Sequence, residues 1–476
     1  ISPLTMRTIV VIGLALTALS AAERNPPAPH ARTLLVKSTS TARPALRASA
    51  TAARGAKDLA AARAQALVEP PPPSMYWALL ANFLYFLSLG MNAINMAFLC
   101  SEVTDGTRTP SPASIALSGK VESVDKLLTF LGVGLLSSMS DVKGRKPLMQ
   151  WSALGFGLTN LMQALTKSSS ASLYVADLID GCSSCMTPIC QAYVADCSPP
   201  EKRATNLGLF QGLSIGIAFV FAFPIGGILG AKYGPRMPMF VAAAIQLLNF
   251  LIITFLTPES HHPSKRKSKL DLREANTVSL LGGLFNKGTL LAGMAIAWFC
   301  LSLARCALDE FVNYTALRFG WTQEQAGPVM VLVGTSVAIA PKLLVPLLGL
   351  KRSILTGLLI FATGLGIVGL APTPSRFMQG ILTVSIGTVC MPGMQAFITN
   401  MAKPEERGAI LGALGSVEML TAAIGSTLYS SILASASSRP NALQGMHFLV
   451  AAALVIVGLA FGAYSLSLPA AAAFLQ

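Results

Sequence analysis

A single glutamate stands in the middle of a long apolar stretch near the C-terminal end of the chain. Glu418 lies in the segment GSVEMLTAAIG, and no basic residue occurs within one helical turn of it. If this stretch crosses a membrane, a charge at its middle costs roughly 2.5–3.5 kcal/mol and needs a partner or a task. A carboxyl group held away from water can exchange protons near neutrality. Glu418 is therefore our first candidate proton carrier, and a structural hydrogen bond to a neighbouring helix is the alternative.

Two further groups of ionisable residues interrupt apolar stretches. In ARCALDEF, Arg305 and Asp309 are four residues apart and would pair on one face of a helix, while Glu310 would point elsewhere. In LYVADLIDG, Asp177 and Asp180 are three residues apart, and two neighbouring carboxylates oppose each other's ionisation. Both groups are candidates for proton or substrate binding. A position in water near the outer mouth is the alternative for the first group.

The remaining polar residues of the apolar stretches have weaker assignments. Asp125 and Lys126 come at the start of a stretch and are predicted to be interfacial. Lys342 would neutralise one of the acids or extend its ammonium group toward water. Five amides are candidates either for a substrate cavity or for hydrogen bonds between helices: Asn82, Asn92, Asn95, Gln191 and Gln395.

Helices that span a membrane must position these residues. Of the 476 residues, 53% are hydrophobic and only 12% are charged, whereas a soluble domain carries about 25% charged residues. Only helices and closed barrels satisfy the backbone in hydrocarbon, and barrel strands would alternate with period two. The continuous apolar runs therefore predict helical spans of ~20 residues. Their ranges are 76–100, 121–140, 148–166, 172–194, 206–229, 237–256, 288–312, 325–348, 353–370, 377–398, 410–434 and 446–466.

The predicted spans form two groups of six. The domains are a leader and spacer at 1–74, an N-terminal bundle at 75–257, a central loop at 258–286, a C-terminal bundle at 287–468 and a tail at 469–476. The chain carries a net charge of +14, and the central loop is its most basic connection after the leader. The positive-inside rule places this loop in the cytoplasm, or in the stroma of a plastid.

The two groups of spans contain a repeated sequence. PICQAYVADCSPPEKRATNLG begins at Pro188, and PGMQAFITNMAKPEERGAILG begins at Pro392. The same offset relates Gln191 to Gln395. A duplicated six-helix unit implies two bundles related by an axis along the membrane normal. The fold class is therefore an all-α polytopic membrane protein with twelve helices in two pseudo-symmetric bundles.

A charged loop joins the second and third predicted spans. In SSMSDVKGRKPLM, Gly144 permits a tight turn, and Asp141 can pair with Arg145 or with the neighbouring bundle. Such a pair could hold one state of a gate and break in the other. Together with Lys146 these residues form a candidate gating loop. A charged loop that only anchors a helix end is the alternative.

This loop resembles the pattern of the major facilitator superfamily. LSGKVESVDKLLTFLGVGLLSSMSDVKGRK, AYVAD and CMPGMQAF are most similar to the tetracycline-resistance and hippocampus-abundant-transcript branch, across roughly 76–466. The resemblance implies proton-coupled transport of a small organic solute by alternating access, with export as one direction that it allows. Asp177 stands where that branch has an arginine, and Pro224 is displaced from the antiporter motif of the fifth span. A facilitator without proton coupling and a non-transporting receptor or scaffold therefore stay as alternatives.

The first 74 residues have the composition of a targeting segment. Met6 and Arg7 precede a short apolar run, and 25–66 is rich in Ala, Arg, Ser and Thr with Asp58 as its one acid. A signal peptide followed by a transit peptide resembles the leader used by algae with complex plastids. The prediction is a plastid envelope membrane, with a secretory-pathway or plasma membrane as the alternative.

Several function classes have no support in the sequence. The basic residues do not form an aromatic-interleaved face, so a nucleic-acid partner is not expected. Cys182 and Cys185 form a CxxC pattern, but packing within a helix explains them better than a metal site. No Walker motif, Rossmann glycine pattern or nucleophile elbow is present. We therefore expect no cofactor, metal or enzyme activity, and a monomer whose partners are the bilayer, a small solute and protons.

Overall fold

The computed structural model describes residues 72–268, 288–401, 407–437, 439 and 443–474. All the regular secondary structure in these residues is helical. The predicted leader lies outside them, as does most of the central loop, including Lys269 and Arg273.

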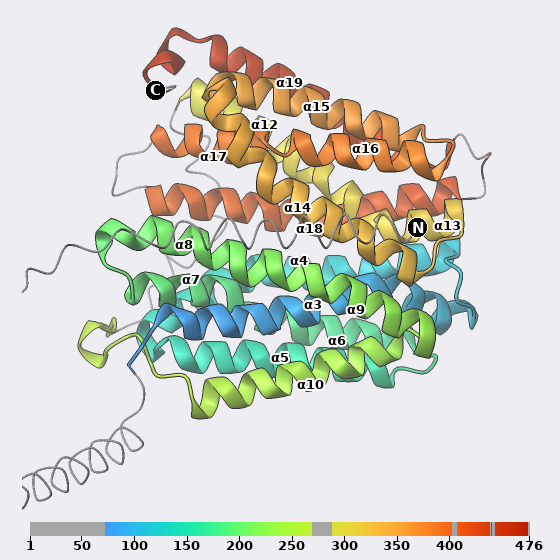
Figure 1. The fold of residues 1–476 in the computed structure, drawn as a ribbon, viewed down its shortest axis with the longest axis horizontal. Coiled ribbons are helices and arrows are strands. Elements are labelled where there is room, and N and C mark those ends of the chain that lie inside the picture. Colours follow the sequence, from blue (N-terminus) through green and yellow to red (C-terminus); the bar gives the residue numbers. More distant parts are fainter. Residues whose placement is uncertain (1–71, 269–287, 402–406, 438, 440–442, 475–476) are drawn as a thin grey trace, which may run out of the picture. The chain divides into compact units, whose positions relative to one another are not determined.

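The described helices account for all twelve predicted spans (Figure 1). The first half contains α3 (Met75–Asp105), α4 (Pro112–Lys143), α5 (Arg145–Leu165), α6 (Ser170–Ser183) with α7 (Met186–Asp196), α8 (Arg203–Gln211) with the π-helix η2 (Gly212–Gly216) and α9 (Ile217–Tyr233), and α10 (Arg236–Phe255). The second half contains α12 (Thr289–Arg305) with the 3-10 helix η4 (Cys306–Glu310) and α13 (Phe311–Phe319), α14 (Gln323–Leu348), α15 (Leu350–Gly369), α16 (Pro374–Gly387) with α17 (Cys390–Asn400), α18 (Arg407–Ala436), and α19 (Met446–Ser467).

Two spans are broken at equivalent places of the repeat. The fourth span breaks between α6 and α7 at Ser184, and the tenth breaks between α16 and α17 at Thr388. Pro188 and Pro392 lie four residues after these positions. A proline has no N–H to donate to the carbonyl four residues earlier, and its ring clashes with that carbonyl. The repeated proline therefore explains both breaks.

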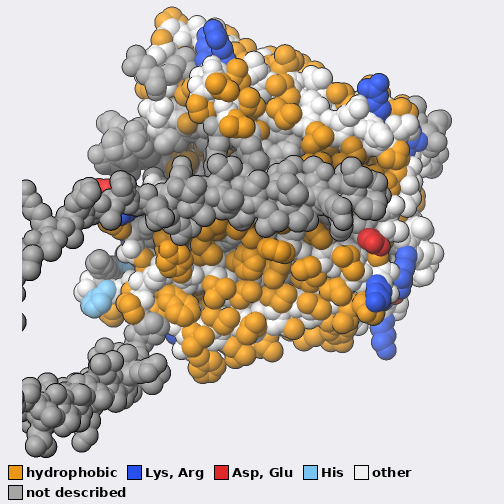
Figure 2. All heavy atoms as spheres, viewed as in Figure 1, with side chains coloured by type: hydrophobic (Ala, Val, Ile, Leu, Met, Phe, Trp, Pro, Cys, Tyr) orange, Lys and Arg blue, Asp and Glu red, His pale blue; other side chains and the backbone are white. Residues whose placement is uncertain are grey.

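The surface of the helices fits an apolar solvent. Within the part of the chain that the structure describes, eight helical segments are long and apolar enough to cross a membrane: 75–105, 205–233, 236–255, 289–319, 350–369, 374–400, 410–436 and 446–467. Large hydrophobic side chains such as Phe255 and Leu347 are exposed. Figure 2 shows hydrophobic side chains along the helices, with most charged side chains near the helix ends on this face. The apolar surface matches a chain that lies in a bilayer.

Two pairs of helices join the two halves: α4 packs on α18, and α9 packs on α14. We call the end that carries residues 141–146 the gate-loop end, and the end that carries residues 106–111 the far end. A Cβ atom at Gly119 would lie 2.5 Å from the carbonyl oxygen of Ser426, and one at Gly227 would lie 2.5 Å from that of Gln323. These glycines let the backbones of the two halves come into direct contact.

Candidate functional site

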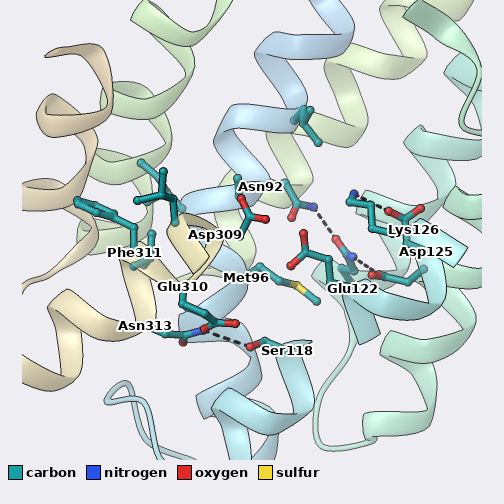
Figure 3. A pocket seen from close by; sticks show the side chains of 18 of the residues that line it. Asn92, Met96, Ser118, Glu122, Asp125, Lys126, Asp309, Glu310, Phe311 and Asn313 are labelled. Atoms are coloured by element: carbon teal, nitrogen blue, oxygen red, sulfur yellow. Dashed lines mark hydrogen bonds and ion pairs between the residues drawn. The ribbon is translucent and has the colours of Figure 1, made fainter. Parts of the chain in front are cut away.

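A cavity of about 290 Å³ lies between the two halves (Figure 3). Helices α3, α4, α5, α6 and α9 line it from the first half, and η4, α13 and α14 line it from the second. Its polar side chains are mostly carboxyl groups, and they come from Glu122, Asp125, Asp177, Asp180, Asp309 and Glu310. Four of these six were predicted as functional from the sequence.

Helix α4 contributes a charged group that was not predicted to be functional. Glu122 lines the cavity, and Asp125 accepts a hydrogen bond from Lys126 Nζ at 2.7 Å. The Asp125 side chain is only 8% exposed. The interfacial prediction for this pair is wrong, because α4 begins at Pro112 and not near Val121. The pair therefore lies about three and a half turns inside the helix.

Helix α6 brings both of its acids to the cavity. Asp177 Oδ1 accepts a hydrogen bond from Gln163 Nε2 at 2.8 Å. Asp180 Oδ1 is buried without a hydrogen-bond partner among the described residues. Asn92 in α3 extends this network, because its Nδ2 donates to Asn160 Oδ1 at 2.8 Å and to Gln163 Oε1 at 2.6 Å. The carboxyl groups of α6 are thus partly held by amides and partly free to meet a ligand.

The second half presents Asp309 and Glu310 to the opposite side of the cavity (Figure 3). Both belong to η4, where the seventh span changes from α- to 3-10 geometry. Asn313 Nδ2 donates to Glu310 Oε2 at 2.8 Å and to Ser118 Oγ of α4 at 3.2 Å. The Asn313–Ser118 bond joins the two halves at the far end of the cavity.

The α-helical pairing predicted for Arg305 and Asp309 is not present. Arg305 ends α12, and the 3-10 segment that follows turns Asp309 to a different face, because four residues of a 3-10 helix cover 480° and not about 400°. No ion pair of Arg305 occurs among the described residues, and its Nε has no hydrogen-bond partner there. Arg305 instead lies within electrostatic range of Glu418 as well as Asp309.

The other candidates have mixed positions. Glu418 in α18 is not part of the cavity wall, so its role as proton carrier remains a prediction. Lys342 lies in α14, and its side chain is outside what the structure describes. Gln191 in α7 and Gln395 in α17 lie beyond the two helix breaks and do not line the cavity.

Two of the predicted amides join neighbouring helices. Asn82 donates to Ser214 Oγ at 2.8 Å and accepts from Thr187 Oγ1 at 3.0 Å. Asn95 donates to the carbonyl oxygen of Gly226 at 3.0 Å. Neither lines the cavity, so hydrogen bonding between helices, the alternative given for these residues, describes them better than substrate contact.

The loop at the gate-loop end has the pairing expected from its sequence. Gly144 has φ +103°, a conformation that favours glycine. Arg145 is 7% exposed, and its Nη1 donates to Asp141 Oδ1 at 2.6 Å and to Ser140 Oγ at 2.5 Å. Its Nε donates to Asp196 Oδ2 of α7 at 3.1 Å. Arg145 therefore ties the second, third and fourth spans together.

The start of the central loop packs on this network. Glu259 accepts hydrogen bonds from the backbone N–H of Arg145 at 2.9 Å and of Lys146 at 3.1 Å. A carboxylate at the N-terminus of α5 is favoured by the helix dipole. Lys267 donates its backbone N–H to the carbonyl oxygen of Asp141 at 3.0 Å. The contact between Glu259 and Arg145 was not predicted from the sequence, because these residues are more than 100 positions apart.

Comparison with known proteins identifies one family over most of the chain, since the Major Facilitator Superfamily matches residues 78–425. Tetracycline resistance protein, class C, of Escherichia coli is 27% identical over 337 residues, covering 70% of this chain and 83% of that protein. Hippocampus abundant transcript-like protein 1 of Homo sapiens is 24% identical over 369 residues, covering 76% of this chain and 71% of that protein. The structure of the human organic anion transporter MFSD10 (TETRAN) shares the fold, with TM-score 0.62, 20% identity, and coverage of 82% of this chain and 100% of that one. The resemblance inferred from the sequence is confirmed.

Proposed function

Because the chain belongs to the major facilitator superfamily, we propose that it is a secondary transporter that couples protons to the movement of a small organic solute. The observation that carries the proposal is the cavity between the two halves, which is lined by carboxyl groups from both of them. Helices of one chain line the cavity from both sides, which supports a monomer as the transport unit.

Alternating access follows from the contacts between the halves. The far end is held by backbone contact at Gly119 and Gly227 and by a 2.6 Å hydrogen bond between the hydroxyls of Ser123 and Thr427. Each of these contacts joins separate bundles, so they can open together when one bundle rocks against the other. The Asp141–Arg145 pair lies within the first bundle and would keep the gate-loop end of that bundle rigid as it moves.

Proton coupling rests on the carboxyl groups that face the cavity. Glu122 from α4 and Asp309 from η4 approach it from different halves (Figure 3). A carboxyl group that meets both water and solute can release a proton when the solute binds, which links the two fluxes. Glu418 gives a matched comparison, because it is also an acid of a predicted span but lies off the cavity wall.

The test is proton movement in proteoliposomes that contain the full chain, with an internal pH dye and a panel of small solutes. Glu122→Gln, Asp309→Asn and Glu418→Gln are measured beside the unsubstituted protein. Solute-dependent proton flux that is lost in the first two variants is the expected result. Loss in Glu418→Gln alone would move the carrier role to α18. Solute flux without proton movement would refute the coupling and leave a facilitator, and no flux of any solute would favour the non-transporting alternative.

The membrane is proposed from the leader sequence, as a plastid envelope. A fusion of residues 1–74 to a fluorescent protein, expressed in an alga with complex plastids, tests this. Fluorescence at the plastid is the expected result, and fluorescence at the plasma membrane or in the secretory pathway would overturn it.

A further inference from the structure

The cavity wall is rich in acceptors and poor in available donors. Among its side chains are six carboxyl groups and one ammonium group, that of Lys126. This ammonium group already binds Asp125 at 2.7 Å, and Glu122 and Asp180 are also its electrostatic neighbours. The wall therefore presents many more carboxyl groups than basic groups to whatever enters.

The neutral donors of the wall are already engaged. Asn92 uses its amide group on Asn160 and Gln163. The amide group of Asn313 donates hydrogen bonds to Ser118 and Glu310. The Ser118 hydroxyl donates to a backbone carbonyl oxygen at 2.9 Å. An anionic solute needs donors, and it would have to take them from these bonds.

Two acceptors in the wall have no partner among the described residues. Asn313 is only 6% exposed, and its Oδ1 is buried without a hydrogen bond. Asp180 Oδ1 is also buried without a hydrogen bond. A buried acceptor left unpaired is unfavourable, so a ligand that brings N–H groups would stabilise it by pairing with it.

The shape and the apolar part of the wall fit an organic cation better than a metal ion. No group of three or more His, Cys, Asp or Glu side chains among the described residues could hold a metal. The cavity has about ten times the ~30 Å³ that one water occupies in the liquid. Phe156, Phe223 and Phe311 also line it. Apolar side chains of this kind accommodate a hydrocarbon body.

We propose that the solute of this cavity is a small organic cation, a protonated amine on an apolar body, which is bound by the carboxyl groups of the cavity wall, with Asp180 of α6 and Glu310 of the second half as its principal ligands. The proposal rests on the transport function proposed above and names its substrate class.

The test compares three probes of nearly equal size and different charge. Phenethylamine is cationic, 2-phenylethanol is neutral and phenylacetate is anionic near neutral pH. Equilibrium dialysis of each radiolabelled probe against the full chain in detergent measures affinity directly. We expect phenethylamine to bind roughly tenfold or more tightly than either of the other two, since a hydrogen bond between charged groups is stronger than one between neutral groups.

Isosteric variants locate the site. Asp180→Asn and Glu310→Gln are each expected to weaken phenethylamine binding roughly tenfold, because each removes a charge-assisted bond. Glu201→Gln is the control, since Glu201 is exposed in a 3-10 turn at the gate-loop end. Size-exclusion profiles establish that the variants are folded. Equal weakening by Glu201→Gln would overturn the assignment.

The outcomes separate this inference from the proposed function. Binding of phenylacetate or 2-phenylethanol as tight as that of phenethylamine, or no binding of any probe, overturns the cation site. Proton-coupled flux of an anionic or neutral solute would also overturn it, while leaving coupled transport intact. Selective binding of phenethylamine without any proton flux would support the cation site and refute the coupling.

Discussion

Replacing Gly119 by alanine is expected to open the far end of the cavity. The added Cβ would lie 1.9 Å from Ser430 Oγ, 2.3 Å from Ser430 Cβ and 2.5 Å from the carbonyl oxygen of Ser426. A rotation of the serine hydroxyl removes the first clash, but the other two involve atoms fixed by the α18 backbone. Helices α4 and α18 must therefore separate before the methyl group fits.

The size of the effect follows from the cost of overpacking. Extra methyl groups in a packed interior cost about 1–3 kcal/mol, and every 1.4 kcal/mol is a factor of ten in an equilibrium. The gain in helix propensity from glycine to alanine applies to both conformations and cancels. We therefore expect the ratio of closed to open far ends to fall roughly 5- to 150-fold.

The assay is labelling of Ser123→Cys with a membrane-impermeant maleimide applied from the side of the far end. Ser123 lies on α4 one helical turn further from the far end than Gly119, and its hydroxyl forms a hydrogen bond with that of Thr427 of α18. Labelling of the protein without Ser123→Cys measures the background from the exposed native thiol of Cys182, and this background is subtracted. Gly415→Ala in α18 is the matched control, because nothing lies within 4 Å of its added Cβ. Unchanged labelling in Gly119→Ala, or an equal increase in Gly415→Ala, would refute the reasoning.

Two other substitutions test the polar networks. Arg145→Lys keeps the charge but loses the planar group that binds two carboxylates and Ser140, so we expect a lower thermal unfolding midpoint in detergent. The control Lys146→Arg should leave the midpoint unchanged, and equal midpoints for the two variants would show that the network adds no stability. Asn92→Leu leaves two buried amide oxygens without their donor, which costs about 1–3 kcal/mol for each oxygen. It should therefore lower the unfolding midpoint more than Asn206→Leu, whose side chain is only partly buried. A decrease no larger than that of Asn206→Leu would contradict this cost.

The sequence was sufficient for the spans and the repeat, because both depend on local composition. Runs of ~20 apolar residues have one stable arrangement in hydrocarbon, so all twelve spans were found. The break at Ser184 was not predicted, although Pro188 was visible as the first residue of the repeated segment. A proline changes the backbone four residues earlier, and apolar runs do not show that effect.

The site was predicted less well, since it depends on distances between helices. Glu122 was missed because the start of α4 was placed nine residues too late, which put the neighbouring charges at the membrane interface. Glu418 was favoured because it has no basic neighbour on its own helix. Its electrostatic neighbour Arg305 belongs to another helix and is more than 100 residues away in sequence. A single sequence cannot supply such a pair.

The acids of the cavity do not follow the repeat, whereas the helix breaks that shape the two bundles do. The offset that relates Pro188 to Pro392 takes Asp177 to Ile381 and Asp180 to Val384, and both of these apolar residues are buried. The prolines shape the backbone in both bundles, so the breaks that let α6 and α16 tilt are symmetric. The carboxyl groups of the cavity belong to α4 and α6 of the first bundle and to the 3-10 segment η4 of the second. A symmetric pair of bundles can rock about its axis whatever it carries, whereas an asymmetric set of carboxyl groups gives a bound cation one preferred orientation. Selection of the solute is therefore expected to depend on residues that differ between the halves, and motion on residues that the halves share.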